Sequence, residues 1–519
     1  MNKKSRDLFW YKTHSWLGLK LSLLLTFILM TGTIAVFSLE IDWLLTPEMR
    51  SKEYVPPEQV AWGASFDSVT EEYSDYDLVG LFRFPESWFS LHGIAITPWQ
   101  ESVRLWLDPL DGEFLGATSW YSVQRFFRSM HRNLMMPERT GTPIVSFMAV
   151  PLTISLIAGF IIYKKFWTGF FKLPRFDRKL RVWVGDFHRL AGLWASWFIA
   201  LMAITSLWYF VEELGGNSPP FPPPAARVED RQYSLPENFT GADLDEAVGK
   251  ALEELPGLQV RRILFPSFYG DPLIIQGDLT ASLVRPRANG VYIDPLNLET
   301  LGSYRGEDLN FHTRISEAAD PLHFGNFGGI TSKFIWFIFG LFMTSMALTG
   351  AVIYTKRLSG KIKPAEEYPP GVGISSRRGH SAFMKQAIMS WWYSMGYWRW
   401  PNAFILSTAI YLSIIYEAVP NDWVEHGFRS LGDVEVQFST RGEIRPGNEF
   451  SGKIDATGTG SITIGFRQNL GEAISLDFAE PGSQEINLIA PETTERQIIL
   501  VASDDSDSLV MWNIGRLYD

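Results

Sequence analysis

Four histidines stand at matched places in this sequence and together could bind a metal cofactor. His14 and His188 each stand four residues before a glycine, in HSWLG and HRLAG, where an apolar run begins. His131 and His323 stand shortly before two other apolar runs, in RSMHRNL and DPLHFGNFGG. An imidazole held in a membrane needs a polar partner, because an unsatisfied polar ring in hydrocarbon is costly. Haem iron offers one, since two neutral imidazoles from different helices can fill its axial positions.

Two glycines support this interpretation. Gly18 and Gly192 lie one helical turn after the first two histidines, on the same helical face, and leave room for a flat macrocycle. Two b-type haems are therefore expected, one near each membrane surface. The predicted axial pairs are His14 with His188 and His131 with His323. Four arginines could pair with the propionates: Arg125, Arg128, Arg132 and Arg189.

A plainer alternative remains for these histidines. A histidine at a helix entrance often hydrogen-bonds a carbonyl or a lipid headgroup, and the motif HxxxG is weak by itself. The remaining histidines are expected to matter less. His92, in a predicted strand, and His426 are expected at the surface, and His380 in a cytoplasmic segment. His312, eleven residues before His323, stays open as a competing ligand at the external site.

Apolar residues are gathered into blocks, which indicates a membrane protein with soluble parts. The 519 residues include 20 Trp and 37 Phe. Five blocks approach the roughly 20 residues that span a bilayer, and the first is expected to be retained rather than cleaved as a signal peptide. The blocks lie at about 16–38, 143–163, 190–211, 334–354 and 402–419.

The charge distribution predicts the orientation of the chain. Residues 1–14, 164–189 and 356–399 hold 20 of the 46 Lys and Arg but only 5 of the 57 Asp and Glu. The positive-inside rule places these segments in the cytoplasm, with the N-terminus inside and the C-terminus in the periplasm. No cysteine is present, which excludes disulfides, iron–sulfur clusters and covalent c-type haem.

An internal duplication organises the first 360 residues. An HxxxG span entrance, a strand and turn, a second histidine and a span ending in glycine recur in one order. The paired landmarks are offset by 174 (His14/His188), 186 (Asp108/Asp294), 192 (His131/His323) and 191 (Gly159/Gly350). The two loops between spans are expected to form two small external α+β modules, and SPPFPPPAARV a stiff linker. After the duplication come an interfacial helix within 380–400, a fifth span and a tail of alternating strands that predicts a β-sandwich.

The same motifs resemble a known family. HSWLG and HRLAG, the turns DPLDGEFLG and YIDPLNLETLG, and DPLHFGNFGG before a span ending in IYTKR are similar to the PepSY-associated transmembrane family of bacterial inner-membrane proteins. The family includes iron-regulated di-haem reductases that release iron from ferric siderophores in the periplasm. The resemblance covers about residues 8–360. It implies that the four histidines are haem ligands and that the loops at about 50–120 and 225–305 are PepSY modules.

The expected fold is an α-helical membrane protein. Duplicated helix–PepSY module–helix units form a four-helix bundle, accompanied by a fifth span, two periplasmic α+β modules and a C-terminal β-sandwich. The expected boundaries are 1–41 (first span), 42–140 (module 1), 141–212 (second and third spans with a basic cytoplasmic loop), 213–330 (module 2), 331–358 (fourth span), 359–400 (cytoplasmic segment with interfacial helix), 401–420 (fifth span) and 421–519 (β-sandwich).

The expected function is that of an inner-membrane di-haem electron conduit. It would reduce a periplasmic acceptor, which the resemblance indicates is a ferric siderophore, in iron acquisition. Neither a nucleotide-binding fingerprint nor a nucleic-acid partner is expected, so a cytoplasmic or membrane donor must supply the electrons, and lipid surrounds the spans. The alternative is a haem-free, membrane-anchored PepSY protein with a binding or regulatory role. Transport is disfavoured, because the spans carry almost no charge and no broken helix is evident.

Overall fold

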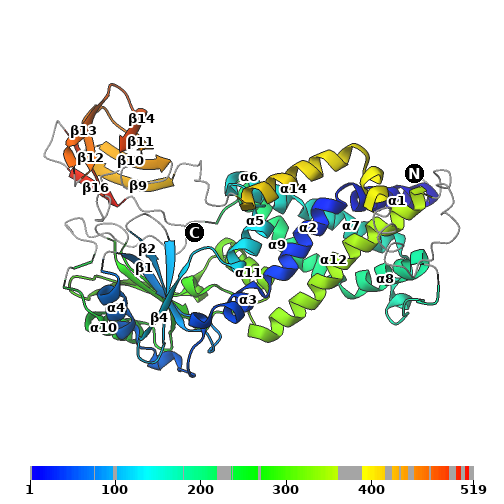
Figure 1. Ribbon diagram of the computed structural model, residues 1–519, viewed down its shortest axis with the longest axis horizontal. Helices are drawn as coiled ribbons and strands as arrows, with labels where there is room; N and C mark the ends of the chain where they lie inside the picture. The colour runs from blue at the N-terminus through cyan, green and yellow to red at the C-terminus, as the bar shows by residue number, and fades with distance from the viewer. Residues whose placement is uncertain are drawn as a thin grey trace. The chain divides into compact units, whose positions relative to one another are not determined.

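The chain folds into two compact units, each assembled from three segments of the sequence (Figure 1). The helical unit comprises Met1–Ile41, Val123–Asn217 and Ala318–Tyr416, and the β-rich unit comprises the remaining segments. The helical unit therefore resumes at Val123 and Ala318, earlier than the boundaries expected after residues 140 and 330. This computed structural model describes residues 3–74, 76–97, 102–178, 180–218, 235–236, 238–266, 271–359, 388–414, 424–431, 434–441, 449–466, 469–489, 498–503 and 509–513.

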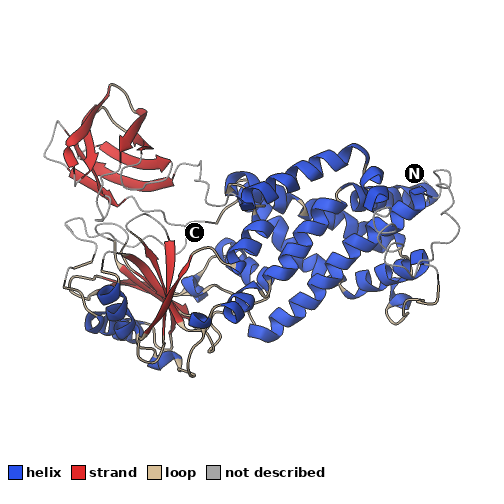
Figure 2. Ribbon diagram, viewed as in Figure 1, coloured by secondary structure: helices blue, strands red, loops and turns tan. Residues whose placement is uncertain are grey.

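Figure 2 shows the helices of the helical unit, and the apolar composition of the longest segments makes this a membrane protein. The segments Glu138–Ile162 and Gly329–Thr355 are each long and apolar enough to cross a bilayer, and two bent helix pairs qualify when each pair is taken as one span. The described residues therefore hold two to four candidate spans. The helices are α1 (Lys3–Lys20), α2 (Ser22–Ala35), α3 (Ser38–Leu45), α5 (Val123–Arg132), α6 (Glu138–Phe147), α7 (Ala149–Ile162), η3 (Phe166–Gly169), α8 (Leu180–Trp194), α9 (Ser196–Glu213), α11 (Phe311–Phe324), α12 (Gly329–Ser359), η6 (Gly396–Trp398) and α14 (Arg399–Ile414).

The first and third spans are broken, which corrects the expectation that no broken helix is present. The bend between α1 and α2 is 68°, and the bend between α8 and α9 is 63°. The breaks fall at Leu21 and Ala195, which are 174 residues apart, the same offset as His14 and His188. Both breaking residues have ψ near zero, and neither is Gly or Pro. The sequence does not mark these points, because Leu and Ala are common inside regular helices and their residue type does not reveal a bridge-region conformation.

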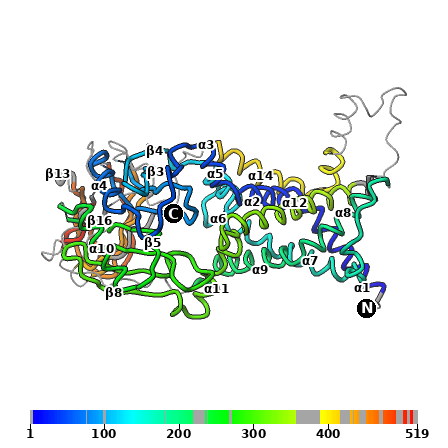
Figure 3. The backbone as a smooth tube through the Cα atoms, turned by 90° about the horizontal axis from the view of Figure 1, so that it is seen from below, coloured from blue at the N-terminus to red at the C-terminus, as the bar shows by residue number. Residues whose placement is uncertain are grey.

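The two halves of the duplication interlock in the helical unit. Helix α1 packs on α7, α2 packs on α5 and α12, and α8 also packs on α12. Figure 3 shows α2 running beside α12. Helices of the first half therefore contact helices of the second half directly, which is the arrangement that can bring distant histidines together.

The predicted fifth span is only partly described. Helix α14 has 16 residues, or about 24 Å of helix, against the roughly 30 Å of a hydrocarbon core. Residues 415–423 lie outside the described residues, so the fifth span stays a prediction. The interfacial helix is described as a helix over 388–394, whereas His380 and the proline-rich linker lie mostly or wholly outside the described residues.

The two predicted external modules are halves of one antiparallel sheet, not separate folds. The strand order is β4-β3-β2-β1-β5-β6-β7-β8, so β1 and β5 join the halves at the centre. Leu81 of β1 pairs with Ile263 of β5. The strands are β1 (Asp77–Phe82), β2 (Leu91–Ile96), β3 (Ser102–Leu107), β4 (Phe114–Ser119), β5 (Gln259–Leu264), β6 (Leu273–Asp278), β7 (Gly290–Ile293) and β8 (Thr300–Tyr304), with short helices η1 (Pro47–Met49), η2 (Pro57–Gln59), η4 (Pro286–Ala288) and η5 (Gly306–Asp308).

Helices α4 (Trp62–Glu72) and α10 (Gly241–Glu254), one from each half, pack on one another beside this sheet and share its apolar core. Asp245 accepts a hydrogen bond from the backbone N–H of Gly63 at 2.9 Å, and Asp67 accepts one from Gly241 at 2.6 Å. Each carboxylate thus satisfies a free N–H in the first turn of the other helix. The two glycines are 178 residues apart, and so are the two aspartates, so the contact obeys a pseudo-twofold symmetry that follows from the duplication.

Substituting Gly63 by alanine is expected to lower the free energy of unfolding by about 1–3 kcal/mol, as overpacking does. A Cβ at this position would overlap the carbonyl oxygen of Gly241, a backbone atom that cannot rotate away. Gly249→Ala on α10 is the matched control, because nothing lies within 4 Å of its added methyl group. Thermal unfolding of the two variants in detergent tests this prediction. Equal melting temperatures would contradict the close approach of α4 and α10 at Gly63.

His92 is buried, which corrects the prediction of a surface position. Its side chain is only 7 % exposed. The ring stacks on Phe82 and Phe84, with centroids 5.4 and 4.7 Å away, and Trp106 lies 5.2 Å away. Burial, and then the charge of Arg104, holds the pKa of His92 well below its usual value. His92 is therefore a neutral residue of the module interior.

The C-terminal tail is a β-sandwich. Two four-stranded antiparallel sheets, β14-β11-β10-β9 and β13-β12-β15-β16, contribute to one apolar core. His426 lies in its first strand. The strands are β9 (Val424–Leu431), β10 (Val434–Arg441), β11 (Glu449–Ala456), β12 (Gly460–Phe466), β13 (Asn469–Phe478), β14 (Gly482–Ile489), β15 (Ile498–Ser503) and β16 (Leu509–Asn513).

Candidate functional site: two histidine pairs

The rings of His14 and His188 lie close together in the helical unit, although 174 residues separate them. His14 is on α1 and His188 on α8, and their ring centroids are 6.3 Å apart with an interplanar angle of 74°. Helix α12 contacts both α1 and α8 and so holds the two histidine-bearing helices near one another. The structure thus brings together the first predicted pair.

His131 and His323 form the second pair. Their ring centroids are 6.1 Å apart and their planes are tilted by 32°. His131 lies near the end of α5 and His323 near the end of α11. Each pair therefore takes one histidine from each half of the duplication. His312 lies eleven residues before His323 on α11, or about 16 Å along the helix, so it does not share this contact.

Two of the histidines donate a hydrogen bond from Nδ1 to a backbone carbonyl. His14 bonds Ser155 O at 3.0 Å, and His131 bonds Ile28 O at 2.9 Å. A carbonyl oxygen can only accept, so Nδ1 carries the proton in both rings. The neutral tautomer then leaves a lone pair on Nε2, which is the form that binds a metal.

The other two histidines bond to threonine hydroxyl groups, with the same result. His188 Nδ1 lies 3.0 Å from Thr349 Oγ1, and His323 Nδ1 lies 2.8 Å from Thr205 Oγ1. Each hydroxyl donates its own hydrogen to a carbonyl one turn earlier in its helix, at 2.8 Å and 3.0 Å respectively. Each threonine oxygen is therefore an acceptor toward its histidine, and all four imidazoles adopt the tautomer with Nε2 unprotonated.

The separation of the rings fits a metal held between two imidazoles. An iron atom bonded to one nitrogen on each side, at about 2 Å, places the two ring centres roughly 6 Å apart. Among the described residues no group of three or more His, Cys, Asp or Glu could hold a metal ion. Two imidazoles alone suit a metal that brings its other ligands with it, as the iron of a macrocycle does.

The glycines around the pairs differ in what they face. A Cβ on Gly18 would meet no atom within 4 Å, which agrees with open space beside His14, whereas one on Gly192 would approach Met346 Cε at 3.2 Å. Gly32 of α2 lies directly against His131, and Gly350 of α12 lies against His188. The first pair of glycines was expected from the motif HxxxG, but the close approach of Gly32 was not.

Gly32→Ala is expected to disturb the His131 site more than any other glycine substitution near the pairs. The added Cβ would lie 2.5 Å from His131 Cε1, so the ring must rotate and lengthen or lose its 2.9 Å bond to Ile28. The tautomer and direction of the ring are then no longer fixed. Nuclear magnetic resonance of histidine labelled with nitrogen-15 would report the change at Nδ1 of one histidine. Gly185→Ala, whose methyl group meets nothing within 4 Å, serves as control, and an identical spectrum for both would contradict the geometry.

Two of the four arginines expected to pair with propionates already contact carboxylates. Arg132 lies 2.8 Å from Glu138, and Arg189 forms an ion pair with Asp186. Near the second histidine pair, Tyr209 Oη donates to Asp320 at 2.7 Å, and the Tyr209 ring lies 5.4 Å from that of His323. The surroundings of His323 therefore include a fixed carboxylate one turn away on α11.

Sequence reasoning found the four histidines but missed the groups that orient them. The acceptors are a carbonyl of α7, a carbonyl of α2 and threonines on α12 and α9. A carbonyl has no sequence signature, and an intrahelical threonine is common in spans. The only available signal was the position of Thr349 beside the landmark Gly350.

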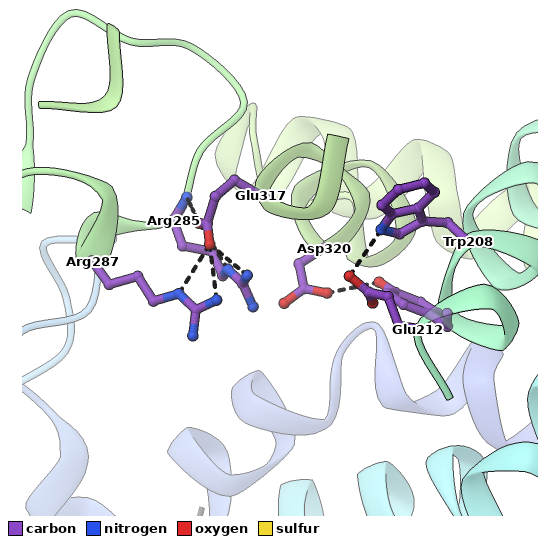
Figure 4. A network of polar contacts seen from close by, with 7 residues as sticks. Trp208, Glu212, Arg285, Arg287, Glu317 and Asp320 are labelled. Atoms are coloured by element: carbon purple, nitrogen blue, oxygen red, sulfur yellow. Dashed lines mark hydrogen bonds and ion pairs between the residues drawn. The ribbon is translucent and has the colours of Figure 1, made fainter. Parts of the chain in front are cut away.

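A separate polar cluster lies in the second module. Arg285 and Arg287 converge on Glu317 of α11, as Figure 4 shows. The shortest bonds are 2.6 Å from Arg285 Nη2 and 2.8 Å from Arg287 Nη2 to Glu317 Oε1, and the carboxylate side chain is 1 % exposed. Burial by itself would raise the pKa of Glu317, but the bonds and charges of the two arginines outweigh it and lower that pKa. The cluster fixes α11 to the 285–287 turn.

Comparison with known proteins agrees with this architecture. The family model described as the PepSY-associated TM region matches residues 11–357, which include both histidine pairs and the whole eight-stranded sheet. No curated protein matches the chain. Because the match covers well over half of the 519 residues and confirms the resemblance seen in the motifs, the chain belongs to the PepSY-associated transmembrane family.

Proposed function

We propose that this membrane protein binds two b-type haems and carries electrons across the bacterial inner membrane to an acceptor in the periplasm. The observation that carries the proposal is the pair of matched histidine sites, with ring centres 6.3 and 6.1 Å apart and every Nδ1 hydrogen-bonded to an acceptor. Such a site holds imidazoles ready to bind a metal through Nε2, and it does so twice in one chain.

Haem fits the residues present. His14 and His188 would hold one group, and His131 and His323 would hold the other, with Gly18 leaving room beside His14. Held by two histidines, haem supplies reversible one-electron transfer. The absence of cysteine leaves non-covalent attachment as the only mode. The protein's own contribution is to fix the tautomers, to bury the rings and to bring each pair together from two halves of the chain.

The charge pattern supports the orientation on which the proposed direction of transfer depends. The basic segments 1–14 and 164–189 flank the helices that carry His14 and His188, so this pair is placed on the cytoplasmic side and His131 with His323 on the periplasmic side. The N-terminus then lies in the cytoplasm, and a cytoplasmic or membrane donor supplies the electrons. A ferric siderophore is the proposed acceptor, and the chain would act as an oxidoreductase in iron uptake. That choice of acceptor rests on the family resemblance.

The test is the visible absorption spectrum of the protein purified from haem-replete cells, oxidised and dithionite-reduced, with haem quantified per chain. We expect a low-spin b-type spectrum and about two haems per chain, one for each bis-histidine site. A colourless protein would overturn the proposal and leave the alternative, a haem-free anchor whose external sheet and sandwich bind a partner.

The acceptor side is tested separately in vesicles loaded with a reductant and supplied outside with a ferric siderophore. Iron reduction outside the vesicles that depends on the protein is expected. Haem reduction without any iron reduction would overturn the choice of acceptor while leaving the electron carrier intact.

A further inference from the structure

The break in the first span opens a backbone hydrogen bond that a regular helix would make. In an unbroken helix the N–H of Leu24 would bond to the C=O of Lys20, four residues earlier. Here α1 ends at Lys20 and α2 begins at Ser22, so this bond is absent. Both groups lie in a segment expected to cross the membrane, where no bulk water can satisfy them.

The side chain of Asn402 fills this gap. Its Oδ1 accepts from Leu24 N–H at 3.1 Å, and its Nδ2 donates to Lys20 O at 3.0 Å. Nδ2 also donates to Trp398 O, at 2.7 Å, in its own segment. Asn402 is 2 % exposed. A side-chain amide has an acceptor oxygen and two donor hydrogens. The oxygen and one hydrogen replace the two ends of the opened backbone bond, and the other hydrogen bonds within the segment that carries Asn402.

Other contacts join the same two segments. Lys20 Nζ donates to the carbonyl oxygens of Ser394 and Met395, at 3.1 and 2.8 Å, where the helix before α14 ends. Trp391 Nε1 donates to Ser22 Oγ at 2.8 Å, directly after the break. A lysine placed on terminal helix carbonyls is stabilised by the dipole as well as by the hydrogen bonds. The break is thus tied at three points to residues 391–402.

Helix α14 also reaches the level of a histidine site. Leu406 and Ala409 of α14 are in the same buried cluster as Leu24 and Ile28 of α2. The carbonyl of Ile28 is the acceptor that orients His131. Contacts of α14 therefore extend along α2 from the break to the turn that holds His131.

These contacts do not belong to the repeated architecture. The equivalent break at Ala195 has nearly the same bend, so bending is a property of the repeat. Asn402 lies outside the matched family region, which ends at residue 357. The C-terminal extension therefore adds a connection to a bend that the duplicated unit already contains.

We propose that Asn402 is a positioning residue, and that residues 391–409 act as a clamp on the broken first span. The clamp holds the existing bend between α1, which carries His14, and α2, which orients His131. It connects the C-terminal extension to both histidine sites. An effect of the clamp on electron transfer rests on the proposed function. The clamp as a set of contacts does not.

The angle of the first span can be measured directly with spin labels. The chain has no cysteine, so a pair of introduced cysteines can be labelled uniquely. Spin labels at Lys12→Cys and Met30→Cys, both exposed positions, report the angle of the first span. A straight helix would separate these positions by about 27 Å, and a bend of 68° shortens this to about 22 Å. Labels at Arg181→Cys and Ile204→Cys, also exposed, report the third span as an internal control.

In the Asn402→Leu variant we expect the first distance distribution to broaden toward longer distances, by up to about 5 Å, since the backbone bond can close. The second distribution is expected to stay unchanged. Lys20→Met, which keeps the apolar stem but removes the ammonium, should produce a smaller change in the same direction, and it provides the test if Asn402→Leu fails to fold. Ser407→Ala, at an exposed position of α14, should change nothing. Unchanged first-span distances in both Asn402→Leu and Lys20→Met would overturn the clamp.

The positioning role has its own readout. If the wild-type protein binds haem, Asn402→Leu should shift the midpoint potential of at least one haem without loss of haem. Unchanged potentials, despite an altered first-span angle, would overturn the positioning role. The label distances do not require haem, so a colourless protein would overturn the proposed function and still leave the clamp to be tested.

Discussion

The His188→Ala variant is expected to contain about one haem per chain, against the two expected in the wild-type protein. In the wild-type protein the ring of His188 lies 6.3 Å from that of His14. Its removal leaves His14 as the single axial ligand, and one axial nitrogen holds haem far less firmly than two. The His131 and His323 pair is built from other helices, α5 and α11, and should keep its low-spin spectrum. Haem quantification with difference spectra measures both effects.

Controls distinguish coordination from general damage. His14→Ala should give the same spectrum as His188→Ala, because both remove the same site. His312→Ala should retain both haems, since His312 is about eleven helical residues, or 16 Å, from the second pair. Added imidazole should restore part of the lost absorbance in His188→Gly. Two haems at full occupancy in His188→Ala would refute the assignment of the ligands.

The Glu317→Gln variant is expected to destabilise the second half of the external sheet by about 3 kcal/mol, the lower end of the range for a broken buried ion pair. The carboxylate is 1 % exposed and receives bonds from two guanidinium groups, whose side chains are 28 % and 35 % exposed. Neutral glutamine leaves both arginines without their anion. Hydrogen exchange of amides in β6, β7 and β8 measures the loss. Glu113→Gln, which breaks an exposed ion pair with Lys52, should cost under about 1 kcal/mol and serves as control.

The effect of Glu317→Gln on the melting temperature should depend on pH. The pKa of Glu317 is lowered in the folded protein, so the ionised form stabilises the fold. Its contribution is complete above the pKa of an unfolded glutamate, about 4.3, and is lost as the pH falls through the lowered folded value. The difference in melting temperature between wild type and Glu317→Gln should therefore persist at pH 7 and shrink below about pH 4. A difference that grows in acid would contradict the sign of the shift.

Local patterns in the sequence were sufficient for several conclusions. The apolar blocks identified a membrane protein, and the motifs identified the family that the match over residues 11–357 confirms. The offset of 174 between His14 and His188 also predicted which positions are equivalent, and the breaks at Leu21 and Ala195 follow the same offset. These features can be read from sequence because hydrophobic length, turn residues and repeated motifs each act within a short window.

Other expectations failed where long-range contacts decide. His92 was expected at the surface of a predicted strand, but aromatic side chains of β1, of the turn after it and of β3 enclose it. The two modules looked separate, but β1 and β5 join them into one sheet. Alternation within a strand shows that one face is buried, but it does not show which strand lies alongside.

The sequence by itself determined that this protein lies in a membrane, that it is built from a duplicated unit, and that four histidines occupy equivalent places in it. Only the tertiary structure decided that His14 lies beside His188 and His131 beside His323, which groups hold each Nδ1, and that the side chain of Asn402 bonds to Leu24, 378 residues earlier in the chain. The reason is physical. Burial and backbone preference act on neighbouring residues, whereas a ring pair or an inserted amide depends on the packing of helices that are distant in sequence.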